Sequence, residues 1–211
     1  MTNAFLNLMA AVLFVFHTGA AHAGVLATDH TYGVFGSSSG QRFLDVATHG
    51  KITDLDILVS FAKCNDPAIG PAGGACRNSG NPYENEIFMH LTSPTGITVE
   101  LIAANTFARG GSGLGQVDVT FDDDGAVLGP HVAAGSFRPV GDLSLFEGLD
   151  VFGRWTLVIG DGNGGDPLEY YHSQLIVSTE AGSVSISEPA SLGLLGLGLL
   201  GLVAVRGRSK W

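Results

Sequence analysis

The chain has 211 residues, of which 45% are hydrophobic and 31 are glycines, and its formal net charge is −10. Residues 24–188 carry 7 basic and 20 acidic side chains, a formal charge of −13, and such a surface repels nucleic acid and anionic membranes. The apolar content excludes a disordered acidic tail, and the scarcity of Lys, Glu, Gln and Arg disfavours a helical protein.

The first 23 residues have the pattern of a secretory signal peptide. Met1 to Ala23 contains no charged side chain, has an apolar centre at Ala10 to Phe16, and ends in the small-x-small sequence Ala21-His22-Ala23. Signal cleavage is therefore expected between Ala23 and Gly24. The alternative is a short membrane anchor, for which the apolar run falls below the roughly 20 residues of a spanning helix.

Residues 24–186 follow as one domain of about 160 residues, long enough to bury a sizeable core. Its first part, residues 24–40, predicts a loose segment with at most one strand. Beyond it, apolar and polar side chains alternate in short runs bounded by Gly, Pro, Asn and Asp, which is the pattern of β-strands. The runs lie at residues 42–46, as an edge strand, and at 55–61, 87–91, 97–103 and 117–121.

The last part of the domain holds its clearest strand. Trp155, Leu157 and Ile159 alternate on one side of it, so we expect all three to face the core. The Gly/Asp-rich loop at 161–166 then turns the chain, and Ser173 to Val177 is expected to run back as the partner strand.

Short strands separated by turns favour an all-β sandwich or jelly roll. Their motifs are also similar, in kind and order, to the P/Homo B domain that follows the protease domain in kexin-like proprotein convertases. The matching pieces are Asp54-Leu55-Asp56-Ile57 to Phe61, Ile87 to Ser93-Pro94-Thr95-Gly96, Val117 to Asp122, and Leu145-Phe146 through Trp155-Thr156-Leu157. This resemblance spans residues 45–178 and implies a jelly-roll β-sandwich of the galactose-binding-like or P-domain-like type. It implies no catalysis, because the protease of that family is a separate domain.

Two cysteines, Cys64 and Cys76, are separated by eleven residues rich in Pro and Gly. In an exported domain this pattern predicts one disulfide. A zinc site is the alternative, but two cysteines without a CxxC motif or a nearby His pair leave such a site short of ligands.

The loop at 161–166 also has the composition of a calcium site. Ca²⁺ takes six to eight oxygen ligands, and Asp161, Asn163, Asp166 and free backbone carbonyls are of that kind. Asp122-Asp123-Asp124 forms a second acidic cluster. Neither stretch completes an EF-hand loop, and a plain solvated turn is the alternative.

The last 25 residues have three parts: Ser187-Glu188-Pro189, the uncharged and Leu/Gly-rich stretch Ala190 to Val205, and a tail with Arg206, Arg208 and Lys210. As a helix the stretch spans about 24 Å, and basic side chains can snorkel to the headgroups around a hydrocarbon core about 30 Å thick. The layout resembles the PEP-CTERM sorting signal of Gram-negative bacteria, whose motif is Pro-Glu-Pro, with Ser187 in the first position. An ordinary C-terminal tail anchor is the alternative.

The PEP-CTERM resemblance implies a transmembrane sorting helix within residues 187–211, cut by an exosortase-like peptidase of the inner membrane. The protein is then exported, transiently membrane-anchored, and placed on the cell surface or in the extracellular matrix. Exopolysaccharide is a candidate partner there.

None of the five histidines of the exported part sits in a Gly-x-Ser-x-Gly elbow or beside a recognisable protease signature, and no His-Glu-x-x-His motif is present, so we expect a non-enzymatic surface or matrix protein. Two alternatives stay open. One is a carbohydrate-binding module, with stacking faces supplied by Tyr32, Tyr83, Tyr170 and Tyr171. The other is an accessory domain for a separately encoded protease.

Overall fold

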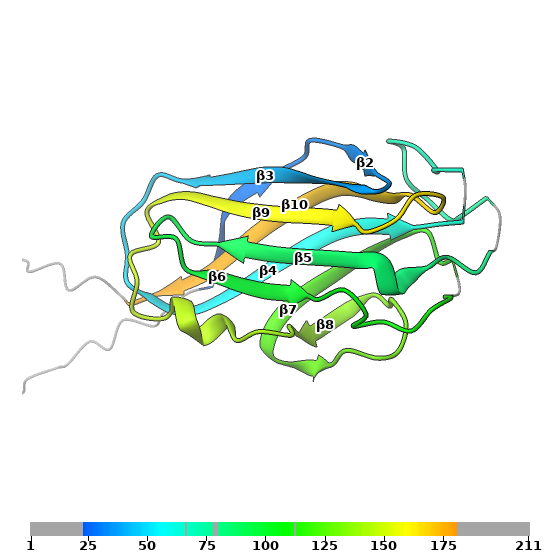
Figure 1. The fold of residues 1–211 in the computed structure, drawn as a ribbon. Helices are drawn as coiled ribbons and strands as arrows, with labels where there is room; N and C mark the ends of the chain where they lie inside the picture. The colour runs from blue at the N-terminus through cyan, green and yellow to red at the C-terminus, as the bar shows by residue number, and fades with distance from the viewer. Residues whose placement is uncertain (1–22, 66, 78–79, 112, 181–211) are drawn as a thin grey trace, which may run out of the picture. The chain divides into compact units, whose positions relative to one another are not determined.

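Two β-sheets packed face to face form the domain (Figure 1), in a computed structural model that describes residues 23–65, 67–77, 80–111 and 113–180. No α-helix occurs among these residues, and none of them belongs to a helix long and apolar enough to cross a membrane. The all-β sandwich predicted from the sequence is therefore confirmed. The predicted signal peptide, sorting motif and membrane span lie outside the described residues.

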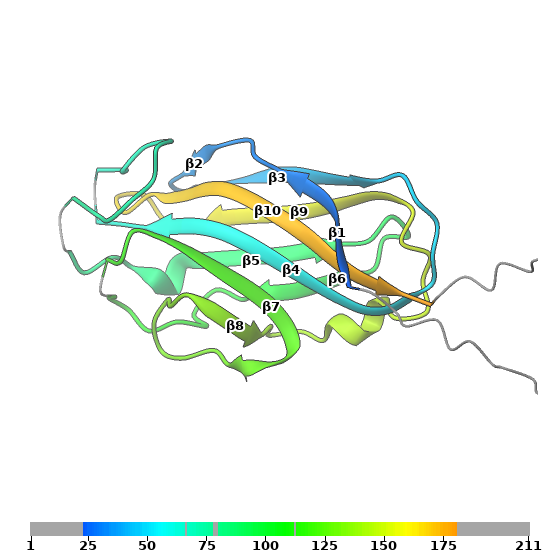
Figure 2. The same cartoon turned by 180° about the vertical axis from the view of Figure 1, so that it is seen from behind.

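One sheet is seen from its outer side in Figure 2 and is antiparallel except between its last two strands. Its order is β1 (Gly24–Asp29), β10 (Leu168–Thr179), β4 (Ile52–Lys63), β7 (Gln116–Val127) and β8 (Gly135–Arg138), and β2 (Gly33–Phe35) also pairs with β10. The second sheet faces the viewer in Figure 1 and is fully antiparallel. Its order is β3 (Ser38–Val46), β9 (Gly153–Asp161), β5 (Ile87–Thr92) and β6 (Thr98–Ile102). Two short 3₁₀ turns, η1 (Glu84–Glu86) and η2 (Leu143–Phe146), complete the described elements.

The core lies between the sheets and is filled by alternate residues of each strand, as side chains with period two require. Trp155, Leu157 and Ile159 are fully buried there, which confirms the prediction for this strand. The indole of Trp155 meets the ring of Phe146 edge-on, with 5.0 Å between centroids, and its Nε1 donates to the carbonyl of Val151 at 2.9 Å. Trp155 thus fixes η2 and the start of β9 on the core.

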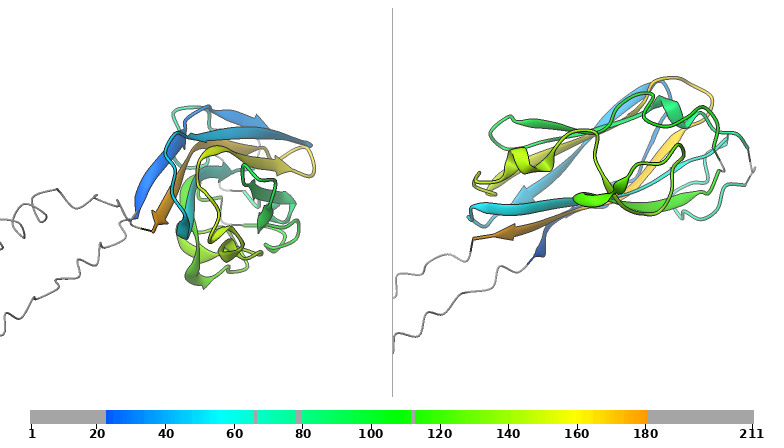
Figure 3. Two further views of the ribbon diagram at one scale, coloured as in Figure 1. Left: turned by 90° about the vertical axis from the view of Figure 1, so that its left-hand side faces the viewer. Right: turned by 90° about the horizontal axis from the view of Figure 1, so that it is seen from below.

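The partner predicted for this strand was wrong. β9 pairs with β3 and β5, whereas β10 pairs with β1, β2 and β4 in the opposite sheet. The loop between β9 and β10 therefore crosses from one sheet to the other, which is visible at one end of the sandwich in Figure 3. Both strands bury a complete apolar face, and two such faces cover each other best from opposite sides of one core.

The N-terminal segment is also more ordered than predicted, because residues 24–40 contain β1, β2 and the start of β3. The turn predicted at Ser93 to Gly96 is confirmed: the amide of Gly96 donates to the carbonyl of Ser93 at 3.0 Å. Gly96 has a φ of +89°, which a residue with a Cβ adopts only at a cost.

The first and last strands of the domain are neighbours. β1 and β10 are antiparallel, and Gly24 is directly opposite Val177. The chain therefore enters and leaves the described domain at the same end of the sandwich (Figure 2). Lys63, at the far end of β4, pairs with Leu168, so the cystine loop that follows it lies at the opposite end.

Candidate functional site

A buried lysine joins the two sheets at the end that carries the cystine loop. Lys63 is the last residue of β4, on the same face as the buried Phe61, and its side chain is 1% exposed. Its Nζ donates to Oδ2 of Asp161 at 2.6 Å and to the carbonyl oxygen of Asp166 at 2.5 Å. A second carboxylate oxygen, Oε2 of Glu86, lies 3.5 Å from the same nitrogen.

The charges of this cluster belong to different sheets. Lys63 is on β4, whereas Asp161 ends β9 and Glu86 immediately precedes β5. Burial raises the pKa of Asp161, and the nearby ammonium of Lys63 acts in the opposite direction but does not cancel it. A buried charge without a partner is very costly. The ammonium of Lys63 and the carboxylates of Asp161 and Glu86 therefore neutralise one another across the two sheets and hold them together here.

The three residues predicted to bind calcium lie around this cluster, but they are engaged with protein groups. Asp161 pairs with Lys63, and Oδ2 of Asp166 accepts a hydrogen bond from the amide of Tyr83 at 2.9 Å. The side-chain amide of Asn163 donates to Glu86 at 3.1 Å and so turns its nitrogen, not its oxygen, toward the cluster. Within the described part of the chain no three His, Cys, Asp or Glu side chains are placed to hold a metal ion. The residues do not fit Ca²⁺, and the calcium prediction is not confirmed.

Sequence reasoning missed Lys63 and Glu86. The signal for Lys63 was present, because the inward-facing alternation Leu55, Ile57, Val59, Phe61 continues to it without a change of register. A charged side chain at such a position must find a partner inside the protein. Glu86 gave no comparable signal.

The predicted disulfide between Cys64 and Cys76 is confirmed. The loop that it closes is held down by Glu169 of β10, whose side chain is buried. Its carboxylate accepts hydrogen bonds from the amides of Ile69 (2.7 Å) and Gly70 (2.8 Å) and from the hydroxyls of Tyr32 (2.6 Å) and Tyr171 (3.2 Å). Burial, followed by this neighbouring carboxylate, raises the pKa of both tyrosines well above its usual range.

These contacts correct the prediction that four tyrosines offer stacking faces. Tyr170 is fully buried and Tyr171 is 8% exposed, because both belong to the interior of the domain. Tyr32 is half-buried against Tyr171 and bound to Glu169. Tyr83 is 37% exposed, and the guanidinium of Arg109 lies over its ring at 4.4 Å.

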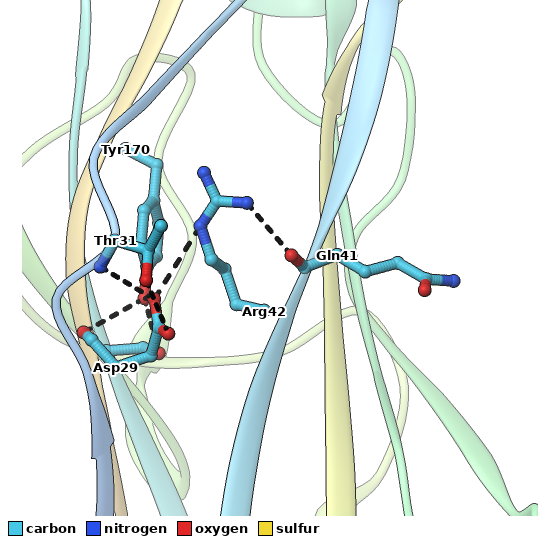
Figure 4. A network of polar contacts seen from close by, with 6 residues as sticks. Asp29, Thr31, Gln41, Arg42 and Tyr170 are labelled. Atoms are coloured by element: carbon cyan, nitrogen blue, oxygen red, sulfur yellow. Dashed lines mark hydrogen bonds and ion pairs between the residues drawn. The ribbon is translucent and has the colours of Figure 1, made fainter.

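A second polar network ties β1 and β10 of one sheet to β3 of the other (Figure 4). The guanidinium of Arg42 lies between the rings of Phe35 and Tyr170, at 5.4 and 4.7 Å from their centroids. Its Nε is 3.6 Å from Oδ1 of Asp29, which also accepts hydrogen bonds from the Tyr170 hydroxyl (3.1 Å) and the amide of Thr31 (3.0 Å). The network closes one side of the sandwich.

The second acidic cluster from the sequence lies in a cavity of about 280 Å³ near η2. Asp123 accepts hydrogen bonds from the amides of Leu143 (3.1 Å) and Ser144 (2.8 Å) and so caps this turn. Burial, and then repulsion from the acidic side chains around it, raises the pKa of the nearby Asp56 to about 7. The carboxyl groups lining the cavity are those of Asp54, Asp122, Asp123, Asp124, Asp142 and Glu147.

Comparison with known proteins identifies one segment of the chain: the PEP-CTERM protein-sorting motif matches residues 185–209. This confirms the resemblance predicted around Ser187, Glu188 and Pro189, whereas the resemblance to P/Homo B domains is not confirmed. No curated protein matches the chain.

Two solved structures of infectious bursal disease virus are similar over 78% of this chain. The Gt strain structure shows 12% identity and a TM-score of 0.31, and the Gx strain structure 13% and 0.29. The match covers 33% of either viral chain, so the present chain spans about a third of their length. A structural similarity with TM-scores this low supports no inference about function.

Proposed function

We propose that this protein is a non-enzymatic β-sandwich that is exported, anchored briefly by its C-terminal segment, and then placed on the cell surface or in the extracellular matrix. The observation that carries the proposal is the PEP-CTERM motif at residues 185–209. That motif implies export, transient membrane anchoring and processing by an exosortase-type sorting enzyme.

The domain itself is suited to this route. β1 begins at Gly24, directly after the predicted signal cleavage point, and β10 ends at Thr179, six residues before the sorting motif begins. Both processing points therefore flank the domain without cutting into a strand. The disulfide between Cys64 and Cys76 is of the kind that persists in an oxidising compartment outside the cytoplasm.

The structural roles of the polar groups described above support a non-enzymatic protein. The carboxylates of Glu169, Asp123 and Asp161 hold a loop, cap a turn and neutralise a lysine, which are functions within the fold. Two histidines form pairs with carboxylates: His49 with Asp150 at 2.7 Å and His131 with Glu84 at 3.1 Å.

Intact-mass measurement on fractions of the native host tests the proposal. We expect a mature form that begins at Gly24, ends near Glu188 and leaves the membrane. Replacing Glu188 and Pro189 by alanine should retain the full C-terminus in the membrane, whereas Ser187→Ala, at a position that already departs from the motif, should be processed normally. Wild-type protein that keeps residues 190–211 in every fraction would reject the proposal in favour of a permanent tail anchor.

A further inference from the structure

We propose that Lys63 and Asp161 become joined by an intramolecular amide bond between Nζ and Cγ, formed with loss of water and with Glu86 as the base. The three side chains are 1%, 0% and 11% exposed. The amine is 2.6 Å from Oδ2 of Asp161 and 3.5 Å from Oε2 of Glu86. This proposal does not depend on the proposed function, because it concerns the chemistry of the folded domain alone.

The position of the reacting groups favours condensation. A nucleophile held against its target inside one molecule reacts as if it were present at about 10⁵–10⁸ M. Water opposes amide formation, and the cluster lies at the end of a core in which Phe61, Ile87, Ile159 and Leu168 are completely buried. Burial also raises the pKa of Asp161 and so favours the carboxylic acid, the form in which Cγ is open to attack.

Glu86 has the geometry of a general base. Its Oε1 accepts the side-chain amide of Asn163 at 3.1 Å, which fixes the orientation of the carboxylate. Its Oε2 is buried and has no hydrogen-bond partner among the described residues, while the ammonium of Lys63 lies 3.5 Å away. A free carboxylate oxygen this close to the amine can take its proton once the pair tightens to hydrogen-bond distance.

The reaction then balances without any further reagent. Glu86 takes one proton from the Lys63 ammonium and passes it to the Asp161 carboxylate, and the neutral amine then attacks Cγ of the resulting carboxylic acid, forming a C–N bond and a tetrahedral centre. The nitrogen of that centre gives its extra proton to Glu86, which delivers it to a hydroxyl of the same centre, and that hydroxyl leaves as water. The products are one amide and one water, and nothing is oxidised or reduced.

The bond would connect β4 of one sheet to β9 of the other, ninety-eight residues apart in the chain. It would lie next to the disulfide, since Cys64 follows Lys63, and at the end of the sandwich opposite to Gly24 and Val177. Separating the sheets at this end would then require breaking a covalent bond.

The test is mass spectrometry of the full chain, expressed with its export and sorting signals, then reduced and denatured. We expect a mass one water below that of the sequence between the mapped termini, and a branched peptide joining Lys63 to Asp161. Glu86→Gln, which keeps the shape but cannot take the proton, should carry the full mass. Asp161→Asn can also react, and should then lose one ammonia.

A competing dehydration must be separated from this one. Asp161 is followed by Gly162, and an Asp-Gly sequence can lose water by closing on its own backbone. The branched peptide, and the disappearance of the mass loss in Lys63→Met, distinguish the two. A wild-type protein with its full sequence mass, or a mass loss that persists in Lys63→Met, would overturn the proposal whether or not the variants are stable.

Discussion

Glu169 in β10 and Ile69 in the cystine loop are one hundred residues apart in the chain, and the carboxylate of the first accepts the backbone amide of the second at 2.7 Å. The carboxylate is completely buried and accepts hydrogen bonds from four donors, none of which carries a positive charge. It therefore acts as an internal acceptor that replaces the strand partners that the loop lacks.

Removing this acceptor should loosen the loop and destabilise the domain. Glu169→Ala leaves two amides and the Tyr32 hydroxyl without a partner, while the Tyr171 hydroxyl keeps only the carbonyl of Gly70 at 3.3 Å, and we expect a loss of roughly 2–4 kcal/mol in the free energy of unfolding. Glu169→Gln keeps one acceptor oxygen and should lose less. Urea denaturation measures both. Equal stability of the alanine variant and the wild type would show that water replaces the carboxylate.

The disulfide should contribute through the same loop. Cys64 and Cys76 are separated by 12 positions, and closing a loop of that size stabilises a domain by roughly 3 kcal/mol in the chain-entropy estimate. Unfolding of the Cys64→Ala/Cys76→Ala variant measures the effect. A double variant that unfolds like the wild type would mean that Glu169 alone holds the loop.

Trp155→Ala should cost roughly 3–5 kcal/mol, because it removes a completely buried ring and leaves a cavity. Val127, on β7, is 78% exposed and offers a matched control. Val127→Ala should stay within about 0.5 kcal/mol of the wild type. The melting temperatures of both variants, compared with that of the wild type, test this prediction. A Trp155→Ala protein with an unchanged melting temperature would contradict the packing described here.

Stability should fall as pH rises through the range in which Asp56 loses its proton. Its pKa is raised from 3.8 to about 7 in the folded state, by burial and by the charges of Asp54 and residues 122–124. Between these two values the folded protein binds more protons than the unfolded chain. The contribution is therefore complete below about pH 4 and is lost as pH approaches and passes 7.

Melting temperatures between pH 4 and pH 8 check this direction, and Asp56→Asn should flatten the curve. Salt should flatten it as well, since Asp56 is only half-buried and salt screens the repulsion between solvent-accessible carboxylates. Asp150 is a suitable comparison, because its pKa is lowered to about 2 by His49 and it stays charged throughout this window. An unchanged pH profile in Asp56→Asn would assign the effect to other carboxyl groups.

The sequence predicted which faces are buried better than it predicted which strands are neighbours. Alternation identifies the inward face of a strand such as Trp155 to Ile159, because burial acts on every second residue. It says nothing about pairing, so β9 and β10 were placed in one hairpin although they lie in opposite sheets. The partner of a strand depends on contacts between residues distant in sequence.

The candidate site was predicted in position but not in chemistry. The acidic loop at 161–166 does contribute to a charged cluster, yet its cation is the ammonium of Lys63, almost one hundred residues earlier in the chain. Composition of a loop cannot reveal a lysine that reaches it from the other sheet. In the same way, residues 122–124 suggested ligands, whereas Asp123 caps a turn that only the fold brings near.

Truncation separates the domain from its sorting segment. β10 ends at Thr179, its last partner is Ile52, and the amide of Glu180 still donates to the carbonyl of Lys51 at 2.8 Å. A chain ending at residue 186 keeps all these contacts, so we expect the melting temperature of the exported domain to match that of the processed wild type. A chain ending at residue 172 loses the buried Leu175 and Val177, all of the pairing of β10 with β1 and most of its pairing with β4, so it should not fold. Circular dichroism and protease resistance measure both. If the first truncation also unfolded, the segment after residue 186 would belong to the structural domain, and its removal during sorting could not leave an intact protein.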